Sequence, residues 1–202
     1  MNPNFRREGH HPGHPLFTPR EELIFNETVL WEDFKAGSES AFIKIYESFF
    51  DILLNYGCQL TGDRGLTKDS IQDLFIEIRQ KREKLGKTDS IKFYLMKSLK
   101  RKLVKQLNKN NRFQSLSQSG NIFEITFSHE KMLIDKQIQE EQSKRLNEAL
   151  KLLSGRKKEV LYYFYFEGLD YEQIRELMDF SHIKSVRNLV YKAVKILKNA
   201  LQ

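Results

Sequence analysis

The stretch YEQIRELMDFSHIKSVRNLVYKAVKIL, residues 171–197, decides how the C-terminal part of this chain folds. Asp170 is a favourable N-cap for a helix over residues 171–178, because its side chain can accept hydrogen bonds from the free N–H groups of the first turn. A short turn over residues 179–182 follows, and the apolar spacing then predicts a second helix over residues 183–201. Two helices joined in this way predict a helix-turn-helix unit.

The last helix separates an apolar face from a basic one. Its apolar positions recur at helical spacing and are expected to face the preceding helix: Ile183, Val186, Val190, Val194, Leu197 and Leu201. The side chains expected to point outward and bind DNA are Lys184, Ser185, Arg187, Asn188, Tyr191 and Lys192. Arg can bond two acceptors on a guanine edge, Asn can pair with adenine, and Lys or Ser can hold phosphates. The alternative is the solvated face of an ordinary surface helix, and the absence of acidic residues after Asp179 favours DNA.

The rest of the chain divides into segments of different composition. Residues 1–20 are rich in Pro, His and Gly and are expected to be a disordered tail. Apolar residues recur at helical spacing through residues 21–107, which we interpret as a first helical domain. Residues 108–136 are polar and irregular, as in a flexible linker, and residues 137–202 form the second domain. The predicted fold class is therefore all-α, with two small helical domains joined by a flexible linker.

The net charge of +7 is distributed unevenly. Residues 21–77 hold 12 acidic and 4 basic side chains, whereas residues 79–112 hold 13 basic and 2 acidic ones. A second basic segment, residues 181–202, holds 5 basic side chains and no acidic one. Two separate basic segments indicate two separate contacts with a polyanion, for which nucleic acid is the leading candidate.

Two helices of the first domain have polar edges of opposite charge. One apolar stripe consists of Ile71, Leu74, Phe75 and Ile78, and beside it lie Asp69, Gln72, Asp73 and Glu77. Gly86 is expected to end this helix. A further stripe at four-residue spacing consists of Ile91, Leu95, Leu99, Leu103 and Leu107, with Lys97, Arg101 and Lys105 on the opposite face. An acidic-edged helix suits a protein partner, whereas a basic face suits phosphate.

These patterns resemble a known family. The segments LSGRKKEVLYYFYFEGLDYEQIRELM (153–178) and KSVRNLVYKAVKIL (184–197) resemble the promoter-binding C-terminal domain of extracytoplasmic-function (ECF) sigma factors. The segment LWEDFKAGSESAFIKIYESFFDILLNYGCQLTGD (30–63) is similar to the opening helices of that family. KDSIQDLFIEI (68–78) is similar to the helix that docks on the clamp of RNA polymerase. The chain departs from the family pattern at Ser154, Asp170 and Arg175, where Pro, Ser and Ala are usual.

The resemblance implies roles for particular residues. The residues that it implies for binding core polymerase are Asp69, Gln72, Asp73, Phe75 and Glu77. Residues 90–112 align with the segment that melts and reads the minus-ten element, and the implied DNA-binding residues are Phe93, Tyr94, Lys97, Lys100, Arg101 and Lys105. Phe93 and Tyr94 could stack on an unpaired base or pack between helices, and both alternatives stay open. The C-terminal domain would read the minus-thirty-five element through the outward residues of the last helix.

The implied function is that of a sigma factor, which binds core RNA polymerase and directs promoter recognition, promoter melting and transcription initiation. The implied partners are core RNA polymerase and promoter DNA. Family members are commonly held by anti-sigma factors, so an inhibitor of this kind is a candidate partner. The linker would either thread through polymerase or act as a passive tether. The alternative is a helix-turn-helix transcription regulator that does not dock on polymerase; the acidic helix and the second basic segment argue against it.

Catalytic and membrane functions are not expected. The sequence has neither GxxxxGK[ST] nor HExxH, and Gly62 and Gly65 stand at the wrong spacing for a phosphate loop. No cofactor or metal site is expected, because no carboxylate or Cys cluster completes a site with the histidines of the tail. The single cysteine, Cys58, fits a reducing compartment, and no apolar run approaches the ~18 residues of a membrane span. We expect a non-enzymatic protein without a membrane-inserted segment, located in the bacterial cytoplasm.

Overall fold

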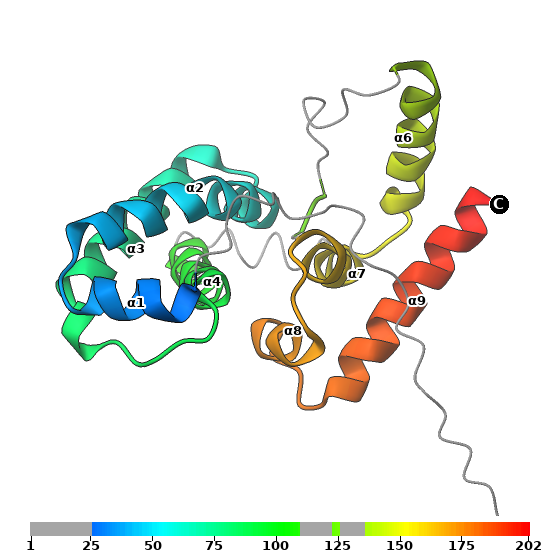
Figure 1. Cartoon of the computed structure of the whole chain (residues 1–202). Helices are drawn as coiled ribbons and strands as arrows, with labels where there is room; N and C mark the ends of the chain where they lie inside the picture. Colours follow the sequence, from blue (N-terminus) through cyan, green and yellow to red (C-terminus); the bar gives the residue numbers. More distant parts are fainter. Residues whose placement is uncertain (1–25, 110–122, 126–135) are drawn as a thin grey trace, which may run out of the picture.

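The computed structural model describes residues 26–109, 123–125 and 136–202, with side chains from residue 144 onward in the last range. Within these residues the regular secondary structure is helical throughout, which confirms the predicted all-α class (Figure 1). The predicted N-terminal tail and most of the predicted linker lie outside the described residues. Among the helices that the structure describes, none is both long enough and apolar enough to traverse a lipid bilayer.

The N-terminal domain consists of helices whose ends are set by capping residues next to them in the sequence. They are α1 (Glu27–Lys35), α2 (Glu39–Thr61), α3 (Arg64–Gln80), the 3-10 turn η1 (Arg82–Lys84) and α4 (Ile91–Lys109). Asn26, Ser38 and Asp63 cap the N-termini of α1, α2 and α3, because each side chain accepts backbone N–H groups of the first turn. Gly62 ends α2 with a φ of 66°, a left-handed conformation that costs glycine little.

The predicted apolar stripes of α3 and α4 meet α2 in a common core. The buried members of the two stripes are Ile71, Leu74, Phe75, Ile78, Ile91, Leu95, Leu99, Leu103 and Leu107. Helix α1 closes one end of this core with Trp31, which is 1% exposed. The indole N–H of Trp31 donates to the carbonyl oxygen of Gly86 at 2.9 Å, and this fastens α1 to the loop before α4.

Two helix ends differ from the sequence-based expectation. Helix α3 ends at Gln80, so the prediction that Gly86 ends this helix is wrong. The physical reason lies in the positions one turn after Ile78, where Lys81 and Arg82 offer the core no apolar side chain. Helix α4 continues to Lys109, two residues past the predicted end of the first domain.

The C-terminal domain contains the predicted helix-turn-helix. Its elements are α6 (Lys136–Lys151), α7 (Gly155–Leu161), the π-helical turn η3 (Tyr162–Phe166), α8 (Tyr171–Leu177) and α9 (Ile183–Leu201). The turn between α8 and α9 includes Asp179, whose φ is 53°. Helix α9 buries Val186, Val190 and Ala193 against the rest of the domain. Its predicted apolar positions at the two ends, Ile183 and Leu201, are 36% and 43% exposed.

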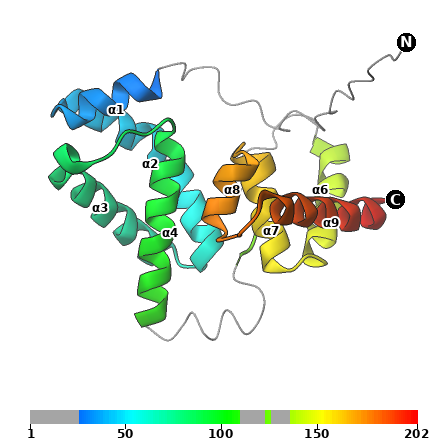
Figure 2. The same cartoon turned by 90° about the horizontal axis from the view of Figure 1, so that it is seen from below.

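The two domains contact each other directly. Helix α8 lies beside α4, as Figure 2 shows, and α9 lies on the side remote from α1 and α3. Phe123, from the segment predicted as a flexible linker, is 1% exposed. The ring of Phe123 packs against the C-terminal domain, and the N–H of Glu124 donates to the carbonyl oxygen of Gln59 in the N-terminal domain.

Candidate functional site

Four of the five predicted polymerase-binding side chains share one exposed side of α3. They are Asp69, Gln72, Asp73 and Glu77, which we call the acidic surface of α3. Their spacing of three and four residues brings them to neighbouring positions on the helix. The same pattern that buries the apolar stripe therefore presents these polar groups to solvent.

The fifth predicted residue, Phe75, lies in the core. It is 3% exposed, and its ring centroid lies 4.8 Å from that of Tyr46 and 6.1 Å from that of Phe42. Phe75 therefore stabilises the helix from within and does not reach the surface in this conformation. The apolar side chain that does reach it is Ile76, which is 54% exposed and lies one turn from Asp73. The sequence analysis did not identify Ile76, although an apolar residue outside the buried stripe of a helix indicates an exposed apolar side chain.

Glu77 connects the acidic surface of α3 to α4. The ammonium group of Lys102 donates to Glu77 Oε1 at 2.6 Å. This hydrogen bond lowers the pKa of the Glu77 carboxyl group, so the carboxylate form persists into more acidic solution. Asp69 and Asp73 are exposed, and no ion pair is described for either of them in this part of the chain.

The predicted minus-ten residues lie along α4, but they are not equally accessible. The basic face of α4 consists of Lys97, Lys100, Arg101 and Lys105. Arg101 and Lys105 are exposed, whereas Lys97 and Lys100 are partly buried. Lys97 Nζ lies 2.5 Å from Glu176 Oε2, and Lys100 Nζ lies 2.7 Å from Glu159 Oε1. Both carboxylates belong to the C-terminal domain, so half of the basic face already has anionic partners.

The two aromatic residues at the start of α4 have different surroundings. The ring centroid of Tyr94 lies 5.0 Å from that of Trp31, so Tyr94 packs between α4 and α1. Burial raises the pKa of the Tyr94 hydroxyl. Phe93 is partly exposed, and the ammonium group of Lys97 lies 5.7 Å from its ring centroid. Both residues are partly buried.

Helix α9 presents the predicted minus-thirty-five residues on its free side. Lys184, Arg187, Asn188, Tyr191 and Lys192 are exposed, and we call them the outer face of α9; Ser185 is partly buried. Val186 and Val190 face the opposite way, into the core. The guanidinium carbon of Arg187 lies 5.2 Å from the ring centroid of Tyr171, a cation–π contact that orients this side chain.

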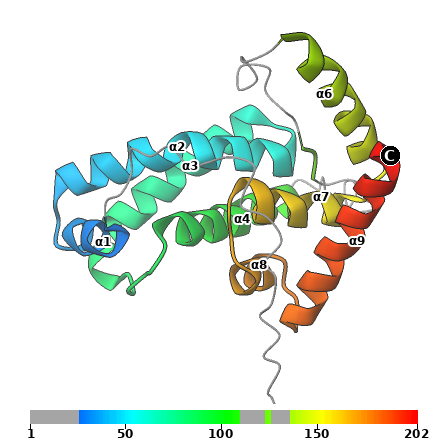
Figure 3. The same cartoon turned by 45° about the vertical axis from the view of Figure 1, so that its right-hand side comes forward.

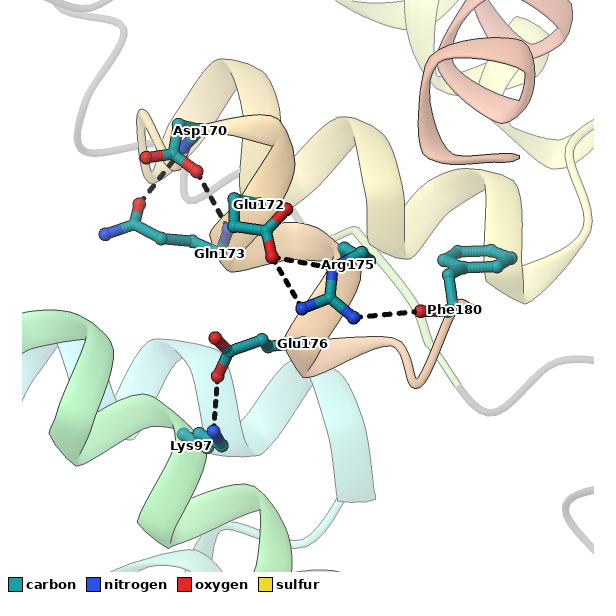
Figure 4. A network of polar contacts seen from close by, with 7 residues as sticks. All are labelled: Lys97, Asp170, Glu172, Gln173, Arg175, Glu176 and Phe180. Carbon is teal, nitrogen blue, oxygen red and sulfur yellow. Dashed lines mark hydrogen bonds and ion pairs between the residues drawn. The ribbon is translucent and has the colours of Figure 1, made fainter. Parts of the chain in front are cut away.

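The turn before α9 is held by a local network of polar contacts (Figure 4). The Asp170 carboxylate accepts the Gln173 N–H at 2.8 Å, and the Gln173 side chain accepts the Asp170 N–H at 3.1 Å. This reciprocal capping box starts α8. Arg175 bonds to Glu172 and to the carbonyl oxygen of Phe180, which ties α8 to the turn. These contacts fix α8 relative to the turn that precedes α9.

The three surfaces lie at different parts of the molecule. The acidic surface of α3 belongs to the N-terminal domain, and α9 lies at the far side of the C-terminal domain (Figures 1 and 3). Helix α4 lies between them, against α8. The described residues therefore present one acidic surface on α3 and two basic faces, one on α4 and one on α9.

The comparisons with known proteins bear on the fold. No family model matches the sequence, and no curated protein does. The helices have the all-α fold of ECF sigma factors. CnrH, solved in complex with the cytosolic domain of CnrY, is similar with a TM-score of 0.56 and 14% identity, over 88% of this chain and 97% of that one. The sigma factor RpoE of Bartonella quintana, solved with the anti-sigma factor NepR, is similar with a TM-score of 0.56 and 18% identity, over 79% of this chain and 96% of that one.

Proposed function

We propose that this chain is an ECF-type sigma factor, which binds core RNA polymerase in the bacterial cytoplasm and directs promoter recognition, promoter melting and transcription initiation. The observation that carries the proposal is the order of three surfaces along a two-domain helical fold: the acidic surface of α3, the basic face of α4 and the outer face of α9. The sigma-factor fold of the similar solved structures supports it.

In this proposal the acidic surface of α3 docks on core polymerase. Asp69 and Asp73 supply negative charge, and Ile76, one turn after Asp73, supplies exposed apolar area beside them. An apolar anchor with a charged rim is the usual composition of a protein interface. Charge complementarity would speed the encounter with a basic patch on the partner and orient it.

The basic face of α4 would capture the non-template strand as the duplex opens. Lys97, Lys100, Arg101 and Lys105 follow one side of the helix and can neutralise successive phosphates. Phe93, whose ring is partly exposed, can stack on an unpaired base. Tyr94 would contribute by holding α4 against α1, because it packs on Trp31.

The outer face of α9 would read the minus-thirty-five element in the major groove. Residues near the N-terminus of a reading helix reach base edges first, which favours Arg187 and Asn188 for that role. Lys184 and Lys192 would hold phosphates. Affinity for duplex DNA should therefore fall steeply as salt rises, because each phosphate contact releases counterions.

An anti-sigma factor is part of the proposal as a regulatory partner. Both similar solved structures are complexes with a second protein, and one of these proteins is named as an anti-sigma factor. This chain shares their fold, so an inhibitor of the same kind is the first partner to seek after core polymerase.

The test is a pull-down of purified core RNA polymerase with the full chain and its Asp73→Arg variant. Reversal of this exposed charge juxtaposes like charges in the docked complex, so the wild type should be retained and the variant largely lost. The matched control is Asp51→Arg, the same reversal at an exposed position of α2, which should be retained like the wild type.

Circular dichroism spectra and melting curves of all three chains establish that each is folded. If the wild type fails to bind core polymerase but binds duplex DNA, the chain is a helix-turn-helix regulator and the sigma-factor proposal is wrong. Equal retention of the Asp73→Arg variant would remove the acidic surface of α3 from the docking site.

A further inference from the structure

Tyr171, the first residue of α8, makes a contact that reaches across to α9. The guanidinium carbon of Arg187, on the outer face of α9, lies 5.2 Å from the centroid of the Tyr171 ring. At this distance the ring attracts the positive charge of the arginine. Tyr171 is partly buried, whereas Arg187 is exposed. The sequence pattern of α9 did not assign Tyr171 to DNA binding, because this residue belongs to the neighbouring helix.

The ring of Tyr171 is itself held in place. The ring centroid of Phe164 lies 5.0 Å from that of Tyr171, and the two ring planes differ by 16°. Phe164 belongs to the π-helical turn η3, and the ring of Tyr165 meets it edge-on at 5.0 Å. The backbone at the start of α8 is fixed by the capping box of Asp170 and Gln173. The Tyr171 ring is therefore restrained on both its backbone and its stacked neighbour.

The contact leaves the hydrogen-bond donors of Arg187 unused. Within the residues that the structure describes, no hydrogen bond or ion pair involves the Arg187 side chain, and the ring of Tyr171 is its one recorded partner. By contrast, Arg79, Arg156 and Arg175 each donate to an oxygen of this chain. A guanidinium group that lies against an aromatic ring keeps its N–H edge free. The N–H groups of Arg187 are therefore available to acceptors outside the protein.

Prior orientation matters for an arginine that reads a base. A guanine edge offers two acceptors, and a bidentate contact requires one orientation of the guanidinium plane. Arginine has large rotamer freedom, and fixing it on binding costs free energy. A side chain that is held before DNA arrives loses less of this freedom than one that moves freely in solvent.

We propose that Tyr171 is a positioning residue for Arg187: its ring holds the guanidinium group in the orientation that reads a base edge, and so sets how strongly α9 discriminates between base pairs. This inference rests on the proposed function, because it assigns α9 to duplex DNA. It deepens that function by giving a residue of α8 a role in specificity through α9. The ring, and not the hydroxyl group, carries this role, so Tyr171→Phe should preserve it.

The contact is first tested in the free chain without DNA. Protons that lie over the face of an aromatic ring resonate upfield of their usual position in a proton NMR spectrum. The side-chain resonances of Arg187 are assigned by their loss in Arg187→Ala, and in the wild type they should be shifted upfield. This shift should be kept in Tyr171→Phe and lost in Tyr171→Leu. Wild-type resonances at the usual position would mean that the contact does not exist in solution, and the inference would be overturned.

The reading role is tested with a library of DNA duplexes that have a randomised central segment. The full wild-type chain enriches duplexes from this library, both alone and in complex with core polymerase. Comparison with Arg187→Ala then identifies the base pair that Arg187 reads, because the preference at that position is lost in the variant. Four duplexes that differ only at this base pair serve as probes, and their affinities are measured by fluorescence anisotropy.

The expected effect of Tyr171→Leu is confined to one base pair. Binding to the preferred duplex should weaken about fivefold, which corresponds to the strength of an exposed cation–π contact. Binding to the other three should change little, because Arg187 makes no bidentate contact there. The matched control is Tyr165→Leu, the same change at another partly buried tyrosine, whose ring neighbours Phe164 and not Arg187. Tyr165→Leu and Tyr171→Phe should both bind like the wild type.

A double-mutant cycle shows whether Tyr171 acts through Arg187. In the Arg187→Ala background, Tyr171→Leu should cause no further loss of affinity. A loss that persists there, an equal loss on all four duplexes, or an equal loss in Tyr171→Phe would mean that Tyr171 acts as a structural residue or as a phosphate contact. Each of these results overturns the inference, as does unchanged binding by Tyr171→Leu.

Two further outcomes are distinguished by the controls. If the melting curve of Tyr171→Leu shows that it does not fold, Tyr171→Met takes its place in the same comparisons, because the flexible methionine side chain adapts to the same site. If the wild type enriches no duplex, alone or with core polymerase, α9 does not read DNA, and the proposed function falls together with the inference. If the wild type enriches duplexes but the Tyr171 variants bind like it, the inference alone is overturned and the proposed function stands.

Discussion

Gly57 lies where α2, α3 and α4 meet, and its replacement by Ala should destabilise the N-terminal domain. An added Cβ atom would lie 2.3 Å from Thr67 Cγ2 and 3.3 Å from Leu103 Cδ1. The threonine methyl cannot simply rotate away, because Thr67 Oγ1 donates to the carbonyl oxygen of Asp63 at 2.7 Å and this bond fixes the rotamer. Helices α2 and α3 would therefore have to move apart.

The magnitude follows from two opposing terms. Overpacking of a tight core costs about 1–3 kcal/mol, and a contact this short belongs at the upper end of that range. Alanine is favoured over glycine within a helix by about 1 kcal/mol. The expected net loss in the free energy of unfolding is therefore about 2 kcal/mol.

The assay is urea unfolding followed by tryptophan fluorescence. The single tryptophan, Trp31, is buried in this domain and reports its unfolding alone. With a slope of about 2 kcal/mol per molar urea, the midpoint should fall by about 1 M. A midpoint that stays the same or rises would refute the steric reasoning.

A double-mutant cycle isolates the contact. Thr67→Ser removes the methyl group that the new Cβ would meet and keeps the hydroxyl group that bonds to Asp63. In that background Gly57→Ala should cost much less, which gives a coupling of about 1 kcal/mol or more between the two sites. Additive losses would mean that Thr67 is not the residue that resists the new methyl group.

Three further predictions concern the capping box of α8, the buried tryptophan of α1 and the exposed arginine of α9. Asp170→Ala removes the capping box of α8 and should lower the stability of the C-terminal domain by about 1 kcal/mol in thermal unfolding, whereas Asp170→Asn should retain most of it; equal losses would contradict the capping role. Trp31→Phe removes the hydrogen bond to Gly86 and leaves part of the indole volume empty, at a cost of about 1–2 kcal/mol by circular dichroism melting; an unchanged melting temperature would mean that α1 contributes little to the core. Arg187→Ala should cost about 1–3 kcal/mol at particular base pairs in binding to variant promoter duplexes, and a uniform loss over all sequences would make Arg187 a phosphate contact.

The ion pairs of α4 also change how the basic charge of the chain is understood. Residues 79–112 carry a large positive excess, which by itself indicates a polyanion. In the folded chain Lys97 and Lys100 of this segment are paired with the C-terminal domain, and Lys102 is paired with Glu77. The positive charge that remains unpaired in this segment is therefore smaller than its composition indicates.

Much of the helical architecture could be predicted from the sequence. Burial of one face of a helix is a periodic property of neighbouring residues, so the stripes of α3 and α4 were visible as repeats of three and four residues. The helix-turn-helix was visible for the same reason, with Asp170 marking the start of α8. Where the periodic signal weakens, as at Gly86 after α3 and at Ile183 at the start of α9, the prediction was less accurate.

The sequence by itself thus determined the fold class, the two basic segments and the exposed polar edge of α3, because each depends on residues within a few turns of one another. Only the tertiary structure decided which charged side chains form ion pairs. Lys100 and Glu159 are 59 residues apart, and the local sequence does not distinguish Glu159 from the many other carboxylates of the chain. The tertiary structure alone decided that Phe123 is buried, because a single apolar residue in an irregular segment has no period. Which charged side chains pair over such long sequence separations is set by the packing of whole domains, and no local sequence pattern encodes it.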